Sequence, residues 1–193
     1  MASGSKERIE AASGDLMARH GYNGMGLKAV SQAAELPYGS IYHHFPGGKE
    51  EIAASAIASL GALVGQLLES LFASRPPDRA VTAMFDYMAD RLEGSDWADG
   101  CPVGTPAQDG ANDSVTVREA CDAAFGAMVT AIAAALVDAG VAETPAHDLA
   151  TTVIAAYEGA TLLARVQRSA APLHATAEVM ATLLRTATGA ATT

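Results

Sequence analysis

The chain has 193 residues, half of them hydrophobic, and a formal net charge of −10. This apolar content supports a packed core and argues against a disordered chain. Two cysteines, Cys101 and Cys121, are too few for a disulfide framework and lack the spacing of metal ligands. Charges or glycines interrupt each long apolar run, and no secretory leader follows Met1. We therefore expect a cytoplasmic protein without a membrane segment.

The charges are distributed unevenly along the chain. Residues 1–50 contain five Lys or Arg and five Asp or Glu, so the whole excess of ten acidic residues lies in the remainder. A neutral N-terminal part joined to an acidic body indicates two separate functions.

Almost every segment has the composition of a helix. Ala, Leu, Met and Glu dominate, and Gly or Pro interrupts the chain at intervals. Gly21 is expected to end the first helix, and the run from Pro46 to Gly48 to separate the third from the fourth. The expected helices span, in chain order, about residues 5–20, 27–34, 37–44, 49–73, 76–93, 97–108, 116–139, 144–168 and 171–185. The predicted fold class is therefore all-α.

Residues 26–46 have the pattern of a helix-turn-helix. Two short helices are joined by a tight turn, and four apolar side chains are spaced to face inward: Val30, Ala33, Leu36 and Ile41. The fold expected from this is a three-helix helix-turn-helix head, residues 1–48, on a six-helix body, residues 49–193.

The same segment resembles the TetR-type regulators, whose third helix typically ends in Leu-Tyr-x-His-Phe followed by a Lys-Glu pair. Here the sequence is Ile-Tyr-His-His-Phe at 41–45, with Lys49 and Glu50 after it. Further features are similar to the LmrA/YxaF branch of that family: the Gly26-Leu27 pair, Pro37, the extra residue before Lys49, and the run Gly-Cys-Pro-Val-Gly at 100–104.

The resemblance implies an operator-binding role for the third helix. Two turns of helix present only a few side chains to base edges in the major groove. The expected base-facing residues are Tyr38, Gly39, Ser40 and His43. The expected phosphate-contacting residues are Lys28, Tyr42, His44 and Lys49. The alternative is that Tyr42 and Phe45 pack between helices and the two histidines only cap the third; for Phe45 we expect this packing role.

Three residues depart from the family pattern. Glu35 lies in the turn where the family usually has Gly, so a left-handed backbone there would cost about 1 kcal/mol. Met25 stands where the family often has a Thr that caps the second helix, and Gly26 could cap in its place. Pro37 replaces a capping Ser. Together with the neutral head, these changes predict modest non-specific DNA affinity.

No pattern for catalysis, cofactor binding or metal binding is present in the sequence. Adjacent helical residues such as His43 and His44 point about 100° apart, and no third ligand follows them. We therefore expect neither an enzyme nor a metal or cofactor site. Cys101 has no nearby Lys or Arg to activate it, so a small buried hydrophobe is preferred over a redox sensor.

The body contains apolar side chains at helical spacing that could form ordinary core or line an effector pocket. The resemblance favours the pocket, which would suit an apolar or aromatic ligand. The candidate ligand-binding residues are Met84, Phe85, Met88, Trp97, Phe125, Met128, Tyr157 and Leu162. Glu158 and Arg165 could orient a ligand or pair across a dimer. The last two helices are rich in small residues, and the resemblance implies that they form a four-helix dimer interface.

The function expected from the sequence is that of a DNA-binding transcriptional regulator. It would bind double-stranded operator DNA as a homodimer, act as a repressor, and leave its operator when a small molecule binds. The alternative is a helical small-molecule-binding protein without DNA binding, which the acidic charge and the altered turn favour.

Overall fold

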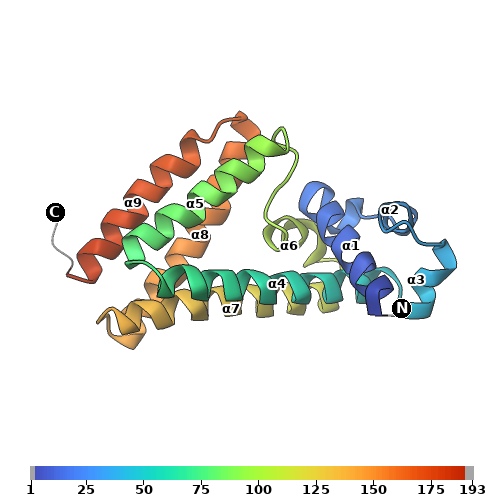
Figure 1. Ribbon diagram of the computed structural model, residues 1–193, viewed down its shortest axis with the longest axis horizontal. Coiled ribbons are helices and arrows are strands. Elements are labelled where there is room, and N and C mark those ends of the chain that lie inside the picture. The colour runs from blue at the N-terminus through green and yellow to red at the C-terminus, as the bar shows by residue number, and fades with distance from the viewer. Residues whose placement is uncertain (1–2, 190–193) are drawn as a thin grey trace. The chain divides into compact units, whose positions relative to one another are not determined.

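The computed structural model describes residues 3–189, and every regular element in that range is an α-helix (Figure 1). The helices are α1 (Ser3–Gly24), α2 (Leu27–Ala33), α3 (Tyr38–His44), α4 (Lys49–Ala73), α5 (Pro77–Gly94), α6 (Gly104–Gly110), α7 (Val115–Asp138), α8 (Glu143–Gln167) and α9 (Ala171–Ala187). The predicted all-α fold, with a helix-turn-helix head and a helical body, is confirmed.

Two expected helix boundaries are wrong. The chain continues past Gly21 into one more helical turn, which ends at Gly24, although the backbone at Gly21 is itself non-helical (φ 72°, ψ 179°). The short helix expected over 97–108 begins only at Gly104, because Asp96 and Trp97 adopt left-handed backbone conformations (φ 53° and 65°) and form a turn. Trp97 therefore lies between α5 and α6, outside any helix.

The chain forms two compact units. The first combines the residues up to Ala62 with Cys101–Phe125, and the second combines Leu63–Gly100 with the residues from Gly126 onward. Helices α4 and α7 each contribute residues to both units. The functional boundary expected after residue 48 stays a prediction.

The first unit has a core formed largely by its three N-terminal helices and the start of α4. Its fully buried side chains include Ile9, Met17, Met25, Val30, Ile41, Phe45, Ile52 and Ile57. Within this unit α6 packs against α1. A Cβ atom at Gly110 would lie 2.8 Å from the Cβ of Tyr22, so only glycine permits this close approach of the two helices.

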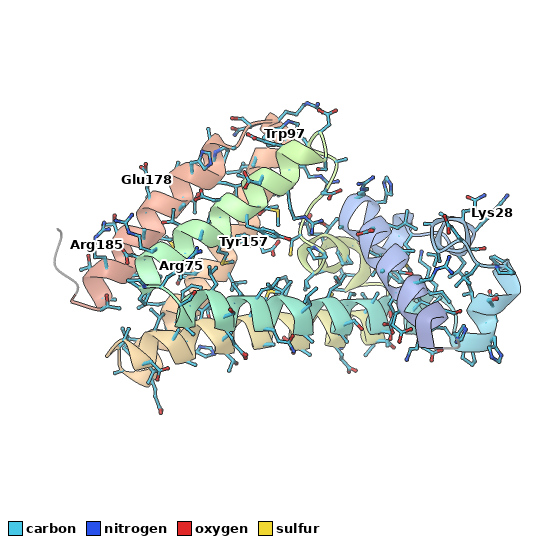
Figure 2. All side chains as sticks on the ribbon, viewed as in Figure 1. Lys28, Arg75, Trp97, Tyr157, Glu178 and Arg185 are labelled. Atoms are coloured by element: carbon cyan, nitrogen blue, oxygen red, sulfur yellow. The ribbon has the colours of Figure 1, made fainter. Side chains whose placement is uncertain are left out.

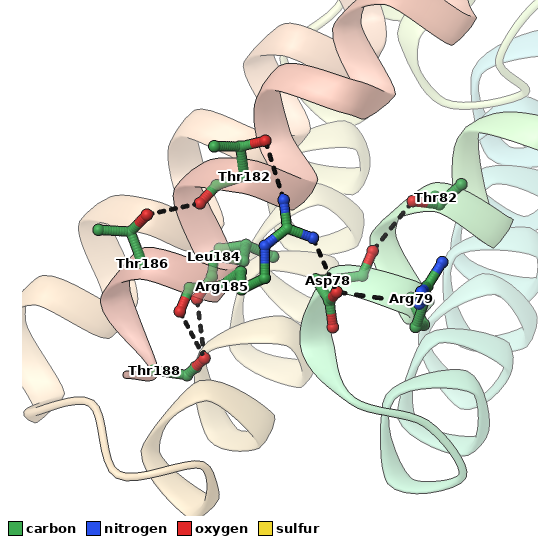
Figure 3. Close-up of polar contacts among 8 residues, drawn as sticks. All are labelled: Asp78, Arg79, Thr82, Thr182, Leu184, Arg185, Thr186 and Thr188. Carbon is green, nitrogen blue, oxygen red and sulfur yellow. Dashed lines mark hydrogen bonds and ion pairs between the residues drawn. The ribbon is translucent and has the colours of Figure 1, made fainter. Parts of the chain in front are cut away.

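The second unit is built around α5, which packs against α9 and α8, and α8 packs against α9 in turn. The rings of Phe85 and Tyr157 meet edge to face, with centroids 5.4 Å apart and planes at 87°. The start of α5 is joined to the end of α9 by an ion pair, in which Arg185 Nη1 lies 3.3 Å from Asp78 Oδ2 (Figure 3).

Helices α4 and α7 are, by length and composition alone, apolar enough to cross a membrane. The charges and glycines noted in the sequence therefore do not interrupt these two apolar runs as expected, but this alone is no evidence of a membrane segment. A core helix of a protein without a membrane segment passes the same test.

Candidate nucleic-acid interface

The helix-turn-helix consists of α2, a four-residue turn and α3. The turn is held by its own backbone, in which Leu36 N donates to Ser31 O at 3.1 Å. The buried Ser31 hydroxyl in turn donates to Leu36 O at 2.7 Å. These two bonds satisfy polar groups at the joint and fix the angle between the two helices. Sequence reasoning did not identify Ser31, because a serine within a helix has many roles that do not depend on such a bond.

Glu35 adopts the left-handed conformation that the family resemblance implies for this turn, with φ 51°. Arg8 of α1 contacts it twice, donating from Nη2 to the Glu35 backbone carbonyl at 3.3 Å and to its carboxylate at 3.4 Å. The turn is thus held from outside the motif by a cation that no local pattern indicated.

The other two departures also have a structural explanation. Met25 is fully buried, so its side chain serves the core. Gly26 occupies the N-cap position of α2 with an extended backbone and no side-chain cap. Pro37 occupies the N-cap position of α3, and its carbonyl accepts a hydrogen bond from Ser40 N at 2.8 Å.

Helix α3 presents an exposed face of polar and aromatic side chains. Tyr38 and Tyr42 are each 48% exposed and their rings meet edge to face, with centroids 5.9 Å apart. A side-chain hydrogen bond with Tyr42 raises the pKa of Tyr38, which favours the neutral phenol with its O–H donor. Gly39 and His43 are exposed and Ser40 is half-buried. Phe45 is buried, as expected, and anchors the end of the helix.

The basic side chains of this region differ in their surroundings. Lys28 is exposed and projects from α2 (Figure 2). Lys49, at the start of α4, is half-buried: its Nζ donates to Asn23 O at 3.2 Å and lies 4.6 Å from the centre of the Tyr22 ring. His44 is half-buried, and its ring meets that of His43 edge to face at 5.1 Å. Among the described residues, no group of three or more His, Cys, Asp or Glu could hold a metal ion.

The last turn of α1 is held by a carboxylate from α6. Asp109 accepts hydrogen bonds from Tyr22 N and Asn23 N, each at 2.8 Å. The side chain of Asn23 donates to Asp113 Oδ2, also at 2.8 Å. Gly21 is the one local signal for an interruption of α1 here, but nothing in the sequence indicates which carboxylate would accept the hydrogen bonds of the two N–H groups that follow it.

The candidate effector residues are only partly brought together. Met84, Phe85 and Met88 of α5 are buried in the second unit, where Phe85 meets Tyr157. Met128 is also buried in that unit. Phe125 belongs to the first unit, and Leu162 is 47% exposed on α8.

Three arginines hold the turn that contains Trp97. Arg91 pairs with Asp99 at 3.0 Å, Arg165 donates to the carbonyl of Ala98 at 3.0 Å, and Arg168 pairs with Asp96. Figure 2 shows Trp97 at the end of α5 and Tyr157 farther along the same unit. The bond to Ala98 is a role for Arg165 that neither sequence alternative included.

An exposed recognition-type helix in an all-helical chain defines the class of protein, a DNA-binding transcriptional regulator. Comparison with known families specifies it further. Residues 9–56 match the family described as bacterial regulatory proteins of the TetR family, and residues 77–179 match the C-terminal domain of LmrA/YxaF-like transcriptional regulators. The chain belongs to the TetR family, in its LmrA/YxaF-like branch, and binds operator DNA.

Individual relatives agree with this assignment. The chain is 31% identical over 182 residues to the HTH-type transcriptional regulator YxaF of Bacillus subtilis, covering 94% of this chain and 95% of that protein. It is 30% identical over 170 residues to LmrA of the same organism, covering 88% and 90%. A TetR regulator from Legionella pneumophila has a similar fold (TM-score 0.82, 23% identity, 92% and 96% covered). So does a cysteine variant of CifR complexed with double-strand operator DNA (TM-score 0.75, 23% identity, 90% and 94% covered).

Proposed function

We propose that this regulator is a repressor, and that a small apolar or aromatic molecule bound in its body releases it from its operator. The proposal rests on the presence of two features in one chain. The first is an exposed face of α3 with Tyr38 and Tyr42, and the second is a unit rich in buried Met and aromatic side chains. A relative at 26% identity is named a transcriptional repressor, DhaR of a Mycobacterium species.

In this proposal α3 enters the major groove. Tyr38, Gly39, Ser40 and His43 face the bases, and the phosphates are contacted by Lys28, Tyr42, His44 and Lys49. The neutral phenol of Tyr38 and the glycine beside it suit close approach to base edges. The DNA-binding part corresponds to residues 1–48 and the effector and dimerisation part to residues 49–193. The protein acts in the cytoplasm by binding alone, without a catalytic step, metal or cofactor.

The proposed dimer surface lies on α8 and α9. Five large apolar side chains are exposed there at helical spacing: Leu162, Leu163 and Val166 on α8, and Val179 and Leu183 on α9. Val166 is 75% exposed, which is unfavourable for a side chain of this type in water. A second copy of the chain, related by a two-fold axis, would cover this surface and pair two recognition helices. Leu162 then serves the dimer instead of the ligand.

The proposed effector site retains the six candidate ligand-binding residues of the second unit that are not on the proposed dimer surface: Met84, Phe85, Met88, Trp97, Met128 and Tyr157. Met and aromatic side chains adapt to irregular apolar molecules, which is why we assign this ligand class.

The test is operator binding measured by fluorescence anisotropy, with DNA from beside the gene that encodes the protein and with a shuffled fragment. We expect the first to bind at least about a thousandfold more tightly. Equal affinity for both fragments would contradict sequence-specific binding and favour a ligand-binding protein without DNA binding. A ligand found by thermal shift should then weaken operator affinity; a ligand that stabilises the protein and leaves this affinity unchanged would contradict the release mechanism.

A further inference from the structure

Asp109 occupies a break in the hydrogen-bonding pattern of α1. At Gly21 the backbone has φ 72° and ψ 179°, a region that only glycine adopts readily. The break leaves the N–H groups of Tyr22 and Asn23 without the carbonyl partners of a continuous helix. Both donate to the Asp109 carboxylate instead, at 2.8 Å each, in charge-assisted bonds.

The approach of this carboxylate depends on the glycine at the break. A Cβ atom at position 21 would lie 2.5 Å from Asp109 Oδ2. Any residue larger than glycine at position 21 would therefore push the Asp109 carboxylate away from the two N–H groups, while the charge of Asp109 stays the same.

The two residues held by Asp109 are the same two that hold the Lys49 ammonium. Asn23, whose N–H donates to Asp109, accepts from Lys49 Nζ through its carbonyl at 3.2 Å. Tyr22, the other residue bound by Asp109, places its ring 4.6 Å from the same nitrogen. The ammonium is thus directed by a turn whose own position depends on α6.

We propose that Asp109 is a positioning residue for operator binding and that it acts through Lys49. The proposal rests on the phosphate contact of Lys49 proposed above. An ammonium already held in one place loses less conformational freedom when it meets a phosphate, so the contact contributes more to affinity. The bridge also joins the two family matches, because Asp109 lies in the C-terminal one and Tyr22, Asn23 and Lys49 lie in the N-terminal one.

A simple charge effect predicts the opposite result, which makes the proposal testable. Burial raises the pKa of Tyr22, and Glu50, Asp113 and Asp109 raise it further, so this corner carries a negative potential. If Asp109 acted only as a nearby charge, neutralising it would reduce repulsion of the DNA and strengthen binding. If Asp109 positions Lys49, neutralising it weakens binding.

The experiment measures operator affinity for Asp109→Asn and Gly21→Ala, with Asp113→Asn as the matched control. An asparagine at position 109 keeps one acceptor but turns an N–H₂ group toward the other N–H, which breaks half of the bridge. Gly21→Ala breaks it sterically with all charges intact. We expect both variants to bind about tenfold more weakly. Asp113→Asn removes the same charge, while its amide oxygen can still accept the single bond from the Asn23 side chain, so affinity should be unchanged or slightly tighter. Far-UV circular dichroism and thermal melting show that each variant is folded at the assay temperature.

Combination with Lys49→Ala separates this proposal from the one on which it rests. Lys49→Ala should weaken binding and flatten the salt dependence by nearly two units per dimer. In that background Asp109→Asn should have less than about a twofold further effect, since its route to the DNA is gone. If Lys49→Ala leaves operator affinity and its salt dependence unchanged, the proposed phosphate contact of Lys49 is overturned. The positioning role of Asp109 is overturned if Lys49→Ala weakens binding and Asp109→Asn still has its full effect in that background. It is also overturned if Asp109→Asn by itself tightens binding, as loss of a nearby charge would.

Discussion

The guanidinium of Arg8 lies 3.3 Å from the backbone carbonyl of Glu35, the residue whose left-handed conformation closes the helix-turn-helix. Its contact with the Glu35 carboxylate is exposed on both sides and therefore adds little stability. The bond to the carbonyl does not depend on the side chain at position 35. The turn thus has a strained backbone at Glu35, and the hydrogen bond from Arg8 that holds it would remain after most substitutions of Glu35.

Glu35→Gly should stabilise the protein, because glycine adopts this conformation without the cost of about 1 kcal/mol. In a chain of this size we expect the melting temperature to rise by about 2–4 °C. Glu35→Ala serves as the control, since it also removes the carboxylate but keeps the strained backbone. Thermal melting in which both variants change the melting temperature equally would show that the left-handed backbone is not the source of the difference.

Arg185→Met should lower the free energy of unfolding by about 1–3 kcal/mol, because the largely buried Asp78 carboxylate loses its principal partner. Methionine retains the apolar stem, so the loss reports the charge. Arg79→Ala is the matched control: Arg79 Nε lies 3.9 Å from the same carboxylate oxygen and its side chain is 76% exposed (Figure 3). Urea unfolding should find the control within about 0.5 kcal/mol of the parent. Equal losses in the two variants would mean that the burial of Asp78 does not determine the strength of the pair.

Cys121 should make the protein less stable at alkaline pH. Burial raises its pKa from 9.0 to about 11. Well below pH 9 the thiol is protonated in the folded and unfolded states alike, so it adds no pH dependence there. Between pH 9 and 11 the unfolded chain loses this proton before the folded chain does, and the free energy of unfolding falls as pH rises. Urea unfolding across this range should show a steeper fall in the parent than in Cys121→Ala; parallel profiles would refute the shift.

Val166→Lys should convert the protein to a monomer and abolish tight operator binding. A charge placed in the proposed α8 and α9 surface would have to be buried without a partner when two copies associate. Leu67→Lys is the control, because Leu67 is a similarly exposed apolar residue that lies on α4. Light scattering should find the control dimeric. A dimeric Val166→Lys variant, or a parent that is monomeric yet binds its operator specifically, would refute the proposed surface.

Much of this protein could be predicted from local sequence. Helical composition and the breaks at Gly and Pro determine nine helices within the described residues, including the helix-turn-helix. Of the four side chains expected to face inward there, Val30 and Ile41 are buried, Leu36 is half-buried, and Ala33 is exposed, so the expectation for Ala33 is wrong. The burial of Phe45 could also be predicted, from its place at the end of a short amphipathic helix. The left-handed turn at Glu35 follows only from the resemblance to a family that usually has Gly there, because glutamate itself does not favour this conformation.

Only the tertiary structure shows which residues of different helices contact one another. Asp109 reaches residues 22 and 23 across more than eighty positions in the chain, and no local pattern could select it from the 22 acidic residues. Lys49 is likewise held against the carbonyl of Asn23, a residue 26 positions away in the chain. Tyr157 and Leu162 lie on the same helix and are both candidates for the effector site by sequence, yet only Tyr157 is buried. Helical periodicity defines which residues share a face, but the packing of neighbouring helices determines which face is covered, and that depends on residues far apart in the sequence.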